Sequence, residues 1–93
     1  MGNRIEKILR KGYWTYNGKE IELCILKQNW DYFYEEGYEE SPDLNENGYA
    51  FYVIFGNFKD LKNANRSSTC LSIEEAITLA ETKISSSIHW DNY

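Results

Sequence analysis

The chain has 93 residues, enough for one hydrophobic core and too few for two independent ones. Hydrophobic residues make up 42% of the chain and aromatic residues 16%, which excludes a disordered acidic tail. The formal net charge is −5, which argues against an extended surface for nucleic acid. We therefore expect one folded domain over residues 1–93.

The sequence also carries signals about compartment. No apolar run is long enough to span a bilayer, and the first residues lack the apolar centre of a signal peptide. Cys24 and Cys70 are far apart and have no redox or metal-binding spacing, which predicts reduced, buried thiols. These features together predict a cytoplasmic protein without a membrane partner.

The first predicted element is a short helix over residues 3–10. Ile5, Ile8 and Leu9 have the i, i+3, i+4 spacing of one helix face, and basic side chains lie between them. Because the run is short, a strand remains the alternative.

A β-hairpin is predicted next, over residues 13–27. Asn17 and Gly18 form a two-residue type I′ turn, in which both central residues need a positive φ. Pairing outward from this turn places Trp14 opposite Ile21. Register and amphipathicity then agree, because a single face receives the apolar side chains of Trp14, Tyr16, Ile21, Leu23 and Ile25.

The middle of the chain is less regular. Residues 28–34 are rich in aromatic side chains and predict either a bulged continuation of the hairpin or a new strand. Residues 35–48 combine acids with glycine, proline and asparagine and predict a loop. Residues 49–55 are apolar at every position, which is typical of a strand buried on both faces.

The last third contains the clearest helix. Residues 56–65 predict a loop, and residues 67–70 a short edge strand. Ser72 and Glu75 have the spacing of a capping box, and small and branched apolar residues follow at helical intervals, which predicts a helix over residues 73–84. Residues 88–90 predict either a final short strand or a tail that packs Trp90 onto the core.

These elements predict the α+β class. The expected architecture is an antiparallel sheet of three to four strands, with the capped C-terminal helix packed on one face and the short N-terminal helix beside it. One amphipathic helix covers only one face of a sheet. The second face, predicted to contain Ala50, Tyr52 and Ile54 together with Leu26 and Tyr13, then needs a cover from the acidic loop, a second protomer or a partner.

One motif is suggestive of calcium binding. Residues 43–48 match the first half of an EF-hand loop, with oxygen ligands at alternate positions and the bend glycine at Gly48. The bidentate carboxylate of such a loop should stand where this chain has Ile54, and Pro42 precedes the motif where a helix is required. We therefore expect no metal site here and interpret the motif as a turn.

The sequence does not predict catalysis either. His89 is the single histidine, and nothing in the sequence places it beside Cys24 or Cys70. There is no glycine-rich phosphate loop, and the paired carboxylates lie in a loop where solvent would surround them. We expect a non-enzymatic protein without a cofactor.

The charge distribution provides the functional hypothesis. Residues 31–46 contain seven acids and no base, whereas residues 1–19 contain five bases and one acid. Acids interleaved with aromatic side chains suit contact with a basic protein, such as a nucleic-acid-binding protein. The predicted partner-binding residues are Trp30, Tyr32, Tyr34, Glu35, Glu36, Tyr38, Glu39, Glu40, Asp43 and Glu46.

Two other interpretations remain open, and a third is not expected. The acids could simply keep an aromatic-rich protein in solution. The chain could be a homodimeric structural or scaffold subunit that associates through an aromatic face of the sheet. The predicted order of helix, three strands and helix also occurs in double-stranded RNA-binding domains, but the acidic loop would repel a phosphate backbone, so direct nucleic-acid binding is not expected.

Overall fold

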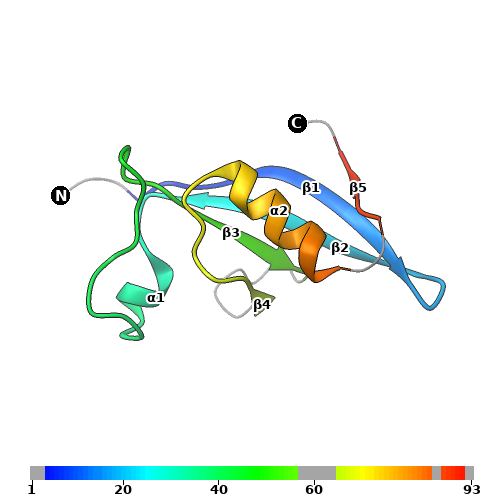
Figure 1. Cartoon of the computed structure of the whole chain (residues 1–93), viewed down its shortest axis with the longest axis horizontal. Helices are drawn as coiled ribbons and strands as arrows, with labels where there is room; N and C mark the ends of the chain where they lie inside the picture. The colour runs from blue at the N-terminus through cyan, green and yellow to red at the C-terminus, as the bar shows by residue number, and fades with distance from the viewer. Residues whose placement is uncertain (1–3, 57–64, 85–86, 92–93) are drawn as a thin grey trace.

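The computed structural model describes residues 4–56, 65–84 and 87–91, which form an antiparallel sheet of five strands and two helices (Figure 1). The strand order is β4-β3-β2-β1-β5. The predicted α+β class is confirmed, but the sheet has five strands and not the expected three to four. In chain order the elements are β1 (Glu6–Tyr16), β2 (Lys19–Gln28), α1 (Tyr32–Glu35), β3 (Ala50–Phe55), β4 (Asn65–Arg66), α2 (Ile73–Lys83) and β5 (His89–Trp90).

The hairpin of β1 and β2 forms with the predicted turn and register. Asn17 and Gly18 have φ angles of 52° and 78°, the positive values that a type I′ turn requires. Trp14 lies opposite Ile21, and each neighbouring pair also matches the prediction. The hairpin determines the shape of the molecule, which measures 45 × 24 × 22 Å, because its tip extends beyond α2 (Figure 1).

The predicted N-terminal helix is wrong, because residues 6–10 belong to β1. The register of β1 against β2 shifts between Ile8 and Arg10, so that Leu9 has no residue opposite it. As a result Ile8 packs against the cluster on one face of the sheet and Leu9 against the cluster on the other. A bulged strand therefore produced the apolar spacing that had indicated a helix.

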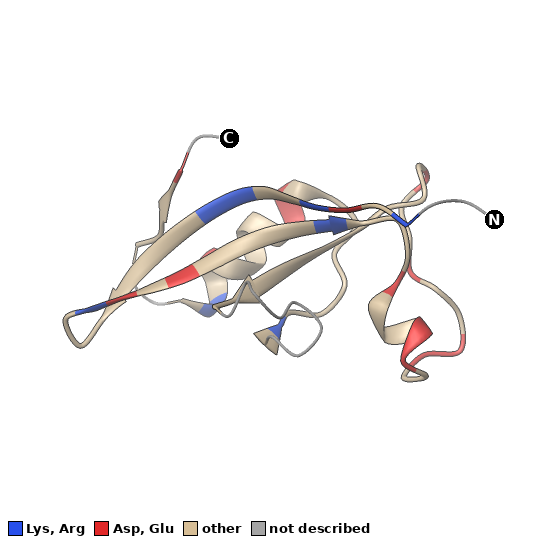
Figure 2. Ribbon diagram, turned by 180° about the vertical axis from the view of Figure 1, so that it is seen from behind, with Lys and Arg blue, Asp and Glu red and all other residues tan. Residues whose placement is uncertain are grey.

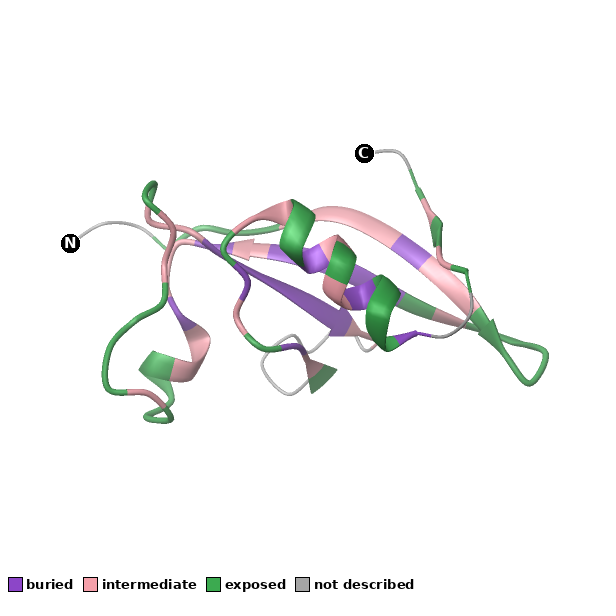
Figure 3. Ribbon diagram, in the orientation of Figure 1, coloured by how far each residue is buried: buried purple, intermediate pink, exposed green. Residues whose placement is uncertain are grey.

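Helix α2 covers one face of the sheet, as predicted. The Ser72 side chain accepts a hydrogen bond from the backbone N–H of Glu75 at 3.1 Å, which caps the first turn. The small side chains of Ala76 and Ala80 are fully buried and allow close packing on the strands (Figure 3). The buried cluster beneath α2 contains Leu23, Ile25, Phe51, Val53, Cys70, Ala76, Ala80 and Ile84.

The second face of the sheet is covered by the acidic segment, which we define as residues 30–46. Its side chains of Tyr32, Phe33 and Leu44 pack against the second buried cluster. This cluster contains Cys24, Leu26, Ala50, Tyr52 and Ile54. Of the three covers that the sequence allowed, the chain's own acidic segment occupies this part of the face. The two cysteines are free and buried, in different clusters.

The edges of the sheet differ in detail from the predictions. The edge strand β4 lies two residues earlier than predicted, and from residues 67–70 only Cys70 adds a bridge, to Phe51. Most of the predicted loop over residues 56–65 lies outside the described residues. The predicted C-terminal strand is confirmed as β5, which pairs with β1 at Gly12 and Tyr13. No helix in the described ranges is long and apolar enough to cross a membrane.

The contact between β1 and β5 requires glycine at position 12. A Cβ atom there would lie 2.8 Å from the carbonyl oxygen of His89 and 2.9 Å from Cε3 of Trp90, closer than side chains pack. We predict that Gly12→Ala lowers the free energy of unfolding by about 1–3 kcal/mol, because β5 must move away. Denaturant unfolding measures the loss.

The control is a chain without residues 88–93. In that background Gly12→Ala should cost little, because the clashing atoms are absent. An equal loss in both backgrounds would show that β5 does not impose the constraint.

Candidate functional site

The acidic segment is held in place by one buried carboxylate, that of Asp31, which is 1% exposed. Its Oδ1 accepts hydrogen bonds from the Phe33 N–H at 3.1 Å, the Tyr52 hydroxyl at 3.0 Å and the Thr69 hydroxyl at 3.3 Å. Its Oδ2 accepts one from the Asp43 N–H at 2.7 Å. Asp31 thereby caps α1, closes the loop up to residue 43 and ties this loop to β3.

The hydrogen bonds determine the charge of Asp31. Burial alone would raise the pKa of this carboxyl, but the bonds from the Asp43 N–H and the Tyr52 hydroxyl outweigh burial and lower the pKa below its usual value. The Tyr52 hydroxyl also accepts a hydrogen bond from the Tyr32 N–H at 2.9 Å. Asp31 is therefore a buried anion whose charge is satisfied by protein donors.

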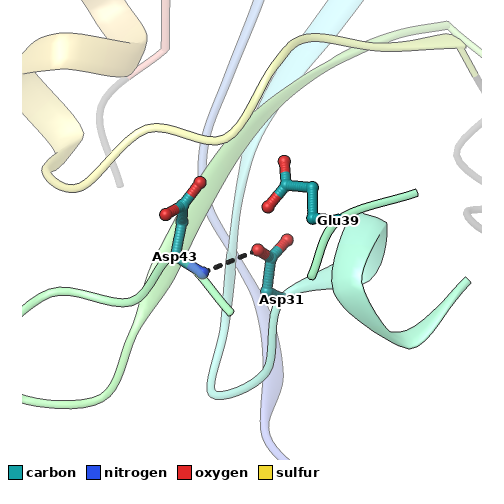
Figure 4. Close-up of side chains that lie close together, drawn as sticks. All are labelled: Asp31, Glu39 and Asp43. Atoms are coloured by element: carbon teal, nitrogen blue, oxygen red, sulfur yellow. Dashed lines mark hydrogen bonds between the residues drawn. The ribbon is translucent and has the colours of Figure 1, made fainter. Parts of the chain in front are cut away.

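Two further carboxyl groups gather around Asp31 (Figure 4). Carboxylate oxygens of Asp31, Glu39 and Asp43 all lie within 4.8 Å of one another. Partial burial, a hydrogen bond with Asp31 and the neighbouring negative charges raise the pKa of Glu39 to about 7. Near neutral pH, the cluster therefore holds a proton that an isolated glutamate would have released.

Three carboxylates are also the ligand type that hard cations prefer. However, Oδ1 of Asp31 already accepts three hydrogen bonds and Oδ2 accepts one. Glu39 and Asp43 could hold a cation only by drawing on a carboxylate that already has internal donors. The shared proton accounts for the cluster as it stands.

The motif that is suggestive of calcium binding forms a turn, as interpreted from the sequence. The Asn45 side-chain oxygen accepts hydrogen bonds from the N–H groups of Asn47 at 2.9 Å and Tyr49 at 3.0 Å. Its amide nitrogen donates to the Leu71 carbonyl at 3.2 Å. Gly48 has a φ of 83°, which suits the turn into β3. Asn45 thus anchors the end of the acidic segment as Asp31 anchors its start.

Several predicted partner-binding residues already contact arginines of the same chain. Arg4 forms an ion pair with Glu35, and its guanidinium carbon lies 4.7 Å from the centre of the Trp30 ring. The guanidinium carbon of Arg66 lies 3.7 Å from the centre of the Tyr32 ring. The inner side of the predicted surface is therefore partly neutralised from within the chain.

The outer side of the acidic segment points to solvent. Figure 2 shows acidic residues gathered in α1 and the following loop, whereas basic residues follow β1. Tyr38 is 75% exposed, and Glu40 and Glu46 form no ion pair within the described ranges. The exposed predicted residues are Tyr34, Glu35, Glu36, Tyr38, Glu40, Asp43 and Glu46, and Glu39 is half-buried.

Sequence reasoning missed the residues that organise this site. Asp31 was only counted as one of the seven acids of residues 31–46, although an aspartate before an aromatic run that ends in glutamate is also an N-cap signal. Arg4 and Arg66 gave no signal, because their contacts with the acidic segment join parts of the chain that are distant in sequence.

The thiols and the histidine lie outside the acidic segment. Burial raises the pKa of the Cys24 thiol to about 12, and burial also raises the pKa of Cys70. Both thiols therefore remain protonated at neutral pH. The ring of His89 stacks on that of Tyr13, with 5.0 Å between the ring centres.

Comparisons of this chain with protein-family models, with curated proteins and with solved structures found no match.

Removal of the buried carboxylate tests the anchoring role of Asp31. We predict that Asp31→Ala lowers the free energy of unfolding by about 2–4 kcal/mol, because it leaves the Tyr52 hydroxyl and the Asp43 N–H without their acceptor. Denaturant unfolding measures this loss. The matched control, Glu40→Ala, removes an exposed carboxylate and should cost less than about 0.5 kcal/mol. Equal costs would contradict the anchoring role.

The raised pKa of Glu39 predicts a specific pH dependence. Between pH 4.5, the ordinary value, and about 7, folded Glu39 keeps a proton that the unfolded chain releases. Its stabilising contribution is thus complete below pH 4.5 and is lost as the pH rises to about 7. We predict that Glu39→Gln flattens the decrease in melting temperature over this range, because an amide keeps its hydrogens.

Glu40→Gln is the control, since it removes one carboxyl from the same loop outside the cluster. It should keep the pH slope of the unmodified protein. The lowered pKa of Asp31 acts below pH 3.8 and leaves the measured range unaffected. If both variants show the unmodified slope, the cluster does not hold the proton.

Proposed function

We propose that this protein is a non-catalytic binding protein whose acidic segment contacts a basic protein partner. A small inhibitor, an immunity-type protein or an anti-defence protein that blocks a nucleic-acid-binding protein would work in this way. The observation that carries the proposal is the joint exposure of tyrosine rings and carboxylates on one anchored loop. We also retain the expectation of a cytoplasmic location.

Anchoring supports this proposal because it reduces the entropy that binding must offset. Asp31 and Asn45 hold the two ends of the loop, and Phe33 and Leu44 pack beneath it. The exposed groups are therefore presented on a preorganised surface. Tyr34 and Tyr38 offer contact area with few rotatable bonds, and the acids attract a basic partner over a longer range.

The absence of catalysis is part of the proposal. Cys24 and Cys70 are buried thiols with raised pKa values, which argues against a nucleophilic role. The most perturbed carboxyl, Glu39, lies in a cluster that already accounts for its proton. Perturbed pKa values occur in structural networks as well as in catalytic sites. Here the buried anion and the shared proton hold a loop in place.

Homodimerisation through the aromatic face of the sheet stays a prediction, but there is less reason to expect it. Ala50, Tyr52 and Ile54 have no exposed surface in the single chain. Phe33 and Leu44 of the acidic segment already pack on this cluster. A second protomer is not needed to cover it.

The proposal predicts a position-specific effect of charge. Reversal of three exposed acids of the loop, Glu36→Lys, Glu40→Lys and Glu46→Lys, should reduce capture of the basic partner from host extract at least about tenfold and weaken its salt dependence. Glu35 and Glu39 are left unchanged, because they have contacts within the chain. Capture at low and at high salt, followed by quantitative mass spectrometry, measures the effect.

The control reverses three exposed acids elsewhere, Glu20→Lys, Glu22→Lys and Glu81→Lys. Both variants change the net charge from −5 to +1, because each reversal adds two charges. The control variant should capture the partner as well as the unmodified protein does. If both variants lose capture equally, net charge alone explains the effect. If neither variant loses capture, the acidic segment does not take part in binding.

A further inference from the structure

A cavity of about 250 Å³ lies at the inner end of the acidic segment. Its walls come from the start of β1, the end of β2, α1 and β4, and they include Arg4, Gln28, Trp30, Tyr32, Glu35 and Glu36. The volume is below the range typical of pockets for drug-sized ligands, about 300–1,000 Å³. A single side chain is therefore an occupant of suitable size.

Gln28 provides the cavity with a buried acceptor. The side chain is 1% exposed, and its amide nitrogen donates a hydrogen bond to Glu6. Its Oε1 has no hydrogen-bond partner in the part of the chain that the structure describes. A buried acceptor without a donor costs free energy, which a ligand with N–H groups would recover on binding.

Two arginines of the chain indicate which type of cation the cavity walls accommodate. The Arg4 guanidinium lies over the Trp30 ring and pairs with the Glu35 carboxylate, and the Arg66 guanidinium lies over the Tyr32 ring. A guanidinium combines a flat face for stacking with several donors for carboxylate and amide oxygens. A lysine ammonium provides a charge but no face that stacks.

The contact made by Arg4 is open to exchange. The Arg4 side chain is 60% exposed and that of Glu35 is 39% exposed. Exposed ion pairs contribute little net free energy, because solvent and salt screen them. A second guanidinium could therefore take the place of Arg4 at a small cost.

We propose that this cavity binds an arginine side chain of the basic partner and that Arg4 is an internal competitor for the same place. The inference rests on the proposed function and specifies its chemistry. The incoming guanidinium stacks on Trp30, pairs with Glu35 and donates to the Oε1 of Gln28. The outer carboxylates of the acidic segment then attract the basic partner, whereas the cavity selects arginine over lysine.

The test uses three capped pentapeptides of glycine with a central arginine, lysine or citrulline, titrated at low salt and followed by NMR. The arginine peptide should bind most tightly. Citrulline keeps the planar shape without the charge, and lysine keeps the charge without a planar group. Arg4→Gln should tighten binding of the arginine peptide about threefold to tenfold, because it removes the competitor.

Gln28→Met tests the buried acceptor, since it keeps the side-chain volume and removes both polar atoms. It should weaken binding of the arginine peptide while the melting temperature stays close to that of the unmodified protein. Glu46→Gln is the matched control for charge and should leave the preference for arginine unchanged, because Glu46 does not line the cavity.

Equal affinity for the arginine and lysine peptides, or an Arg4→Gln variant that binds no better, would overturn the inference about the cavity. If reversal of Glu40 and Glu46 alone, which lie outside the cavity, still reduces capture in that case, the proposed function survives without the arginine site. If capture is also insensitive to those reversals, both proposals fail.

Discussion

The buried carboxylate of Asp31 is the constraint on which the candidate site depends. A charge at 1% exposure is costly unless donors surround it, and here two hydroxyls and two backbone N–H groups do so. These donors come from α1, β3, residue 43 and residue 69, so the acidic segment cannot leave the sheet without exposing or orphaning a charge. The loop thus behaves as part of the fold although it contains only one helical turn of regular structure.

This anchoring gives one segment two opposite surfaces. The inner surface of Phe33 and Leu44 closes the second face of the sheet, which α2 cannot reach. The outer surface must be polar in any case, but that requirement does not specify the sign of its charge. A surface that serves solubility alone usually mixes both signs. Here seven acids occur without a base, and partial burial together with the neighbouring Asp31 and Asp43 raises the pKa of Glu39 to about 7. Under the proposed function, this uncompensated charge serves recognition and not solubility alone.

Local chemistry predicted those parts of the fold that depend on neighbouring residues. The Asn17-Gly18 turn determined the hairpin register, and the Ser72 cap located the start of α2. The N-terminal helix was wrong because a bulge at Leu9 gave a strand the apolar spacing of a helix. The site was predicted only in outline, since Asp31 resembles its acidic neighbours in sequence. What distinguishes it is contact with Tyr52 and Thr69, which are 21 and 38 residues away.

The distribution of charge within the site separates two contributions to binding. Arg4 and Arg66 lie at the inner side of the acidic segment, so the carboxylates there act at short range and in fixed geometry. Glu40 and Glu46 lie at the outer side without ion pairs among the described residues, so their field extends into solvent for about 8–10 Å at ordinary salt. Long-range attraction changes mainly the rate of association, whereas stacking and desolvated hydrogen bonds change mainly the lifetime of a complex. Under the proposed function, the outer acids would therefore govern how often a basic partner arrives, and the aromatic and amide groups beneath them would govern how long it stays.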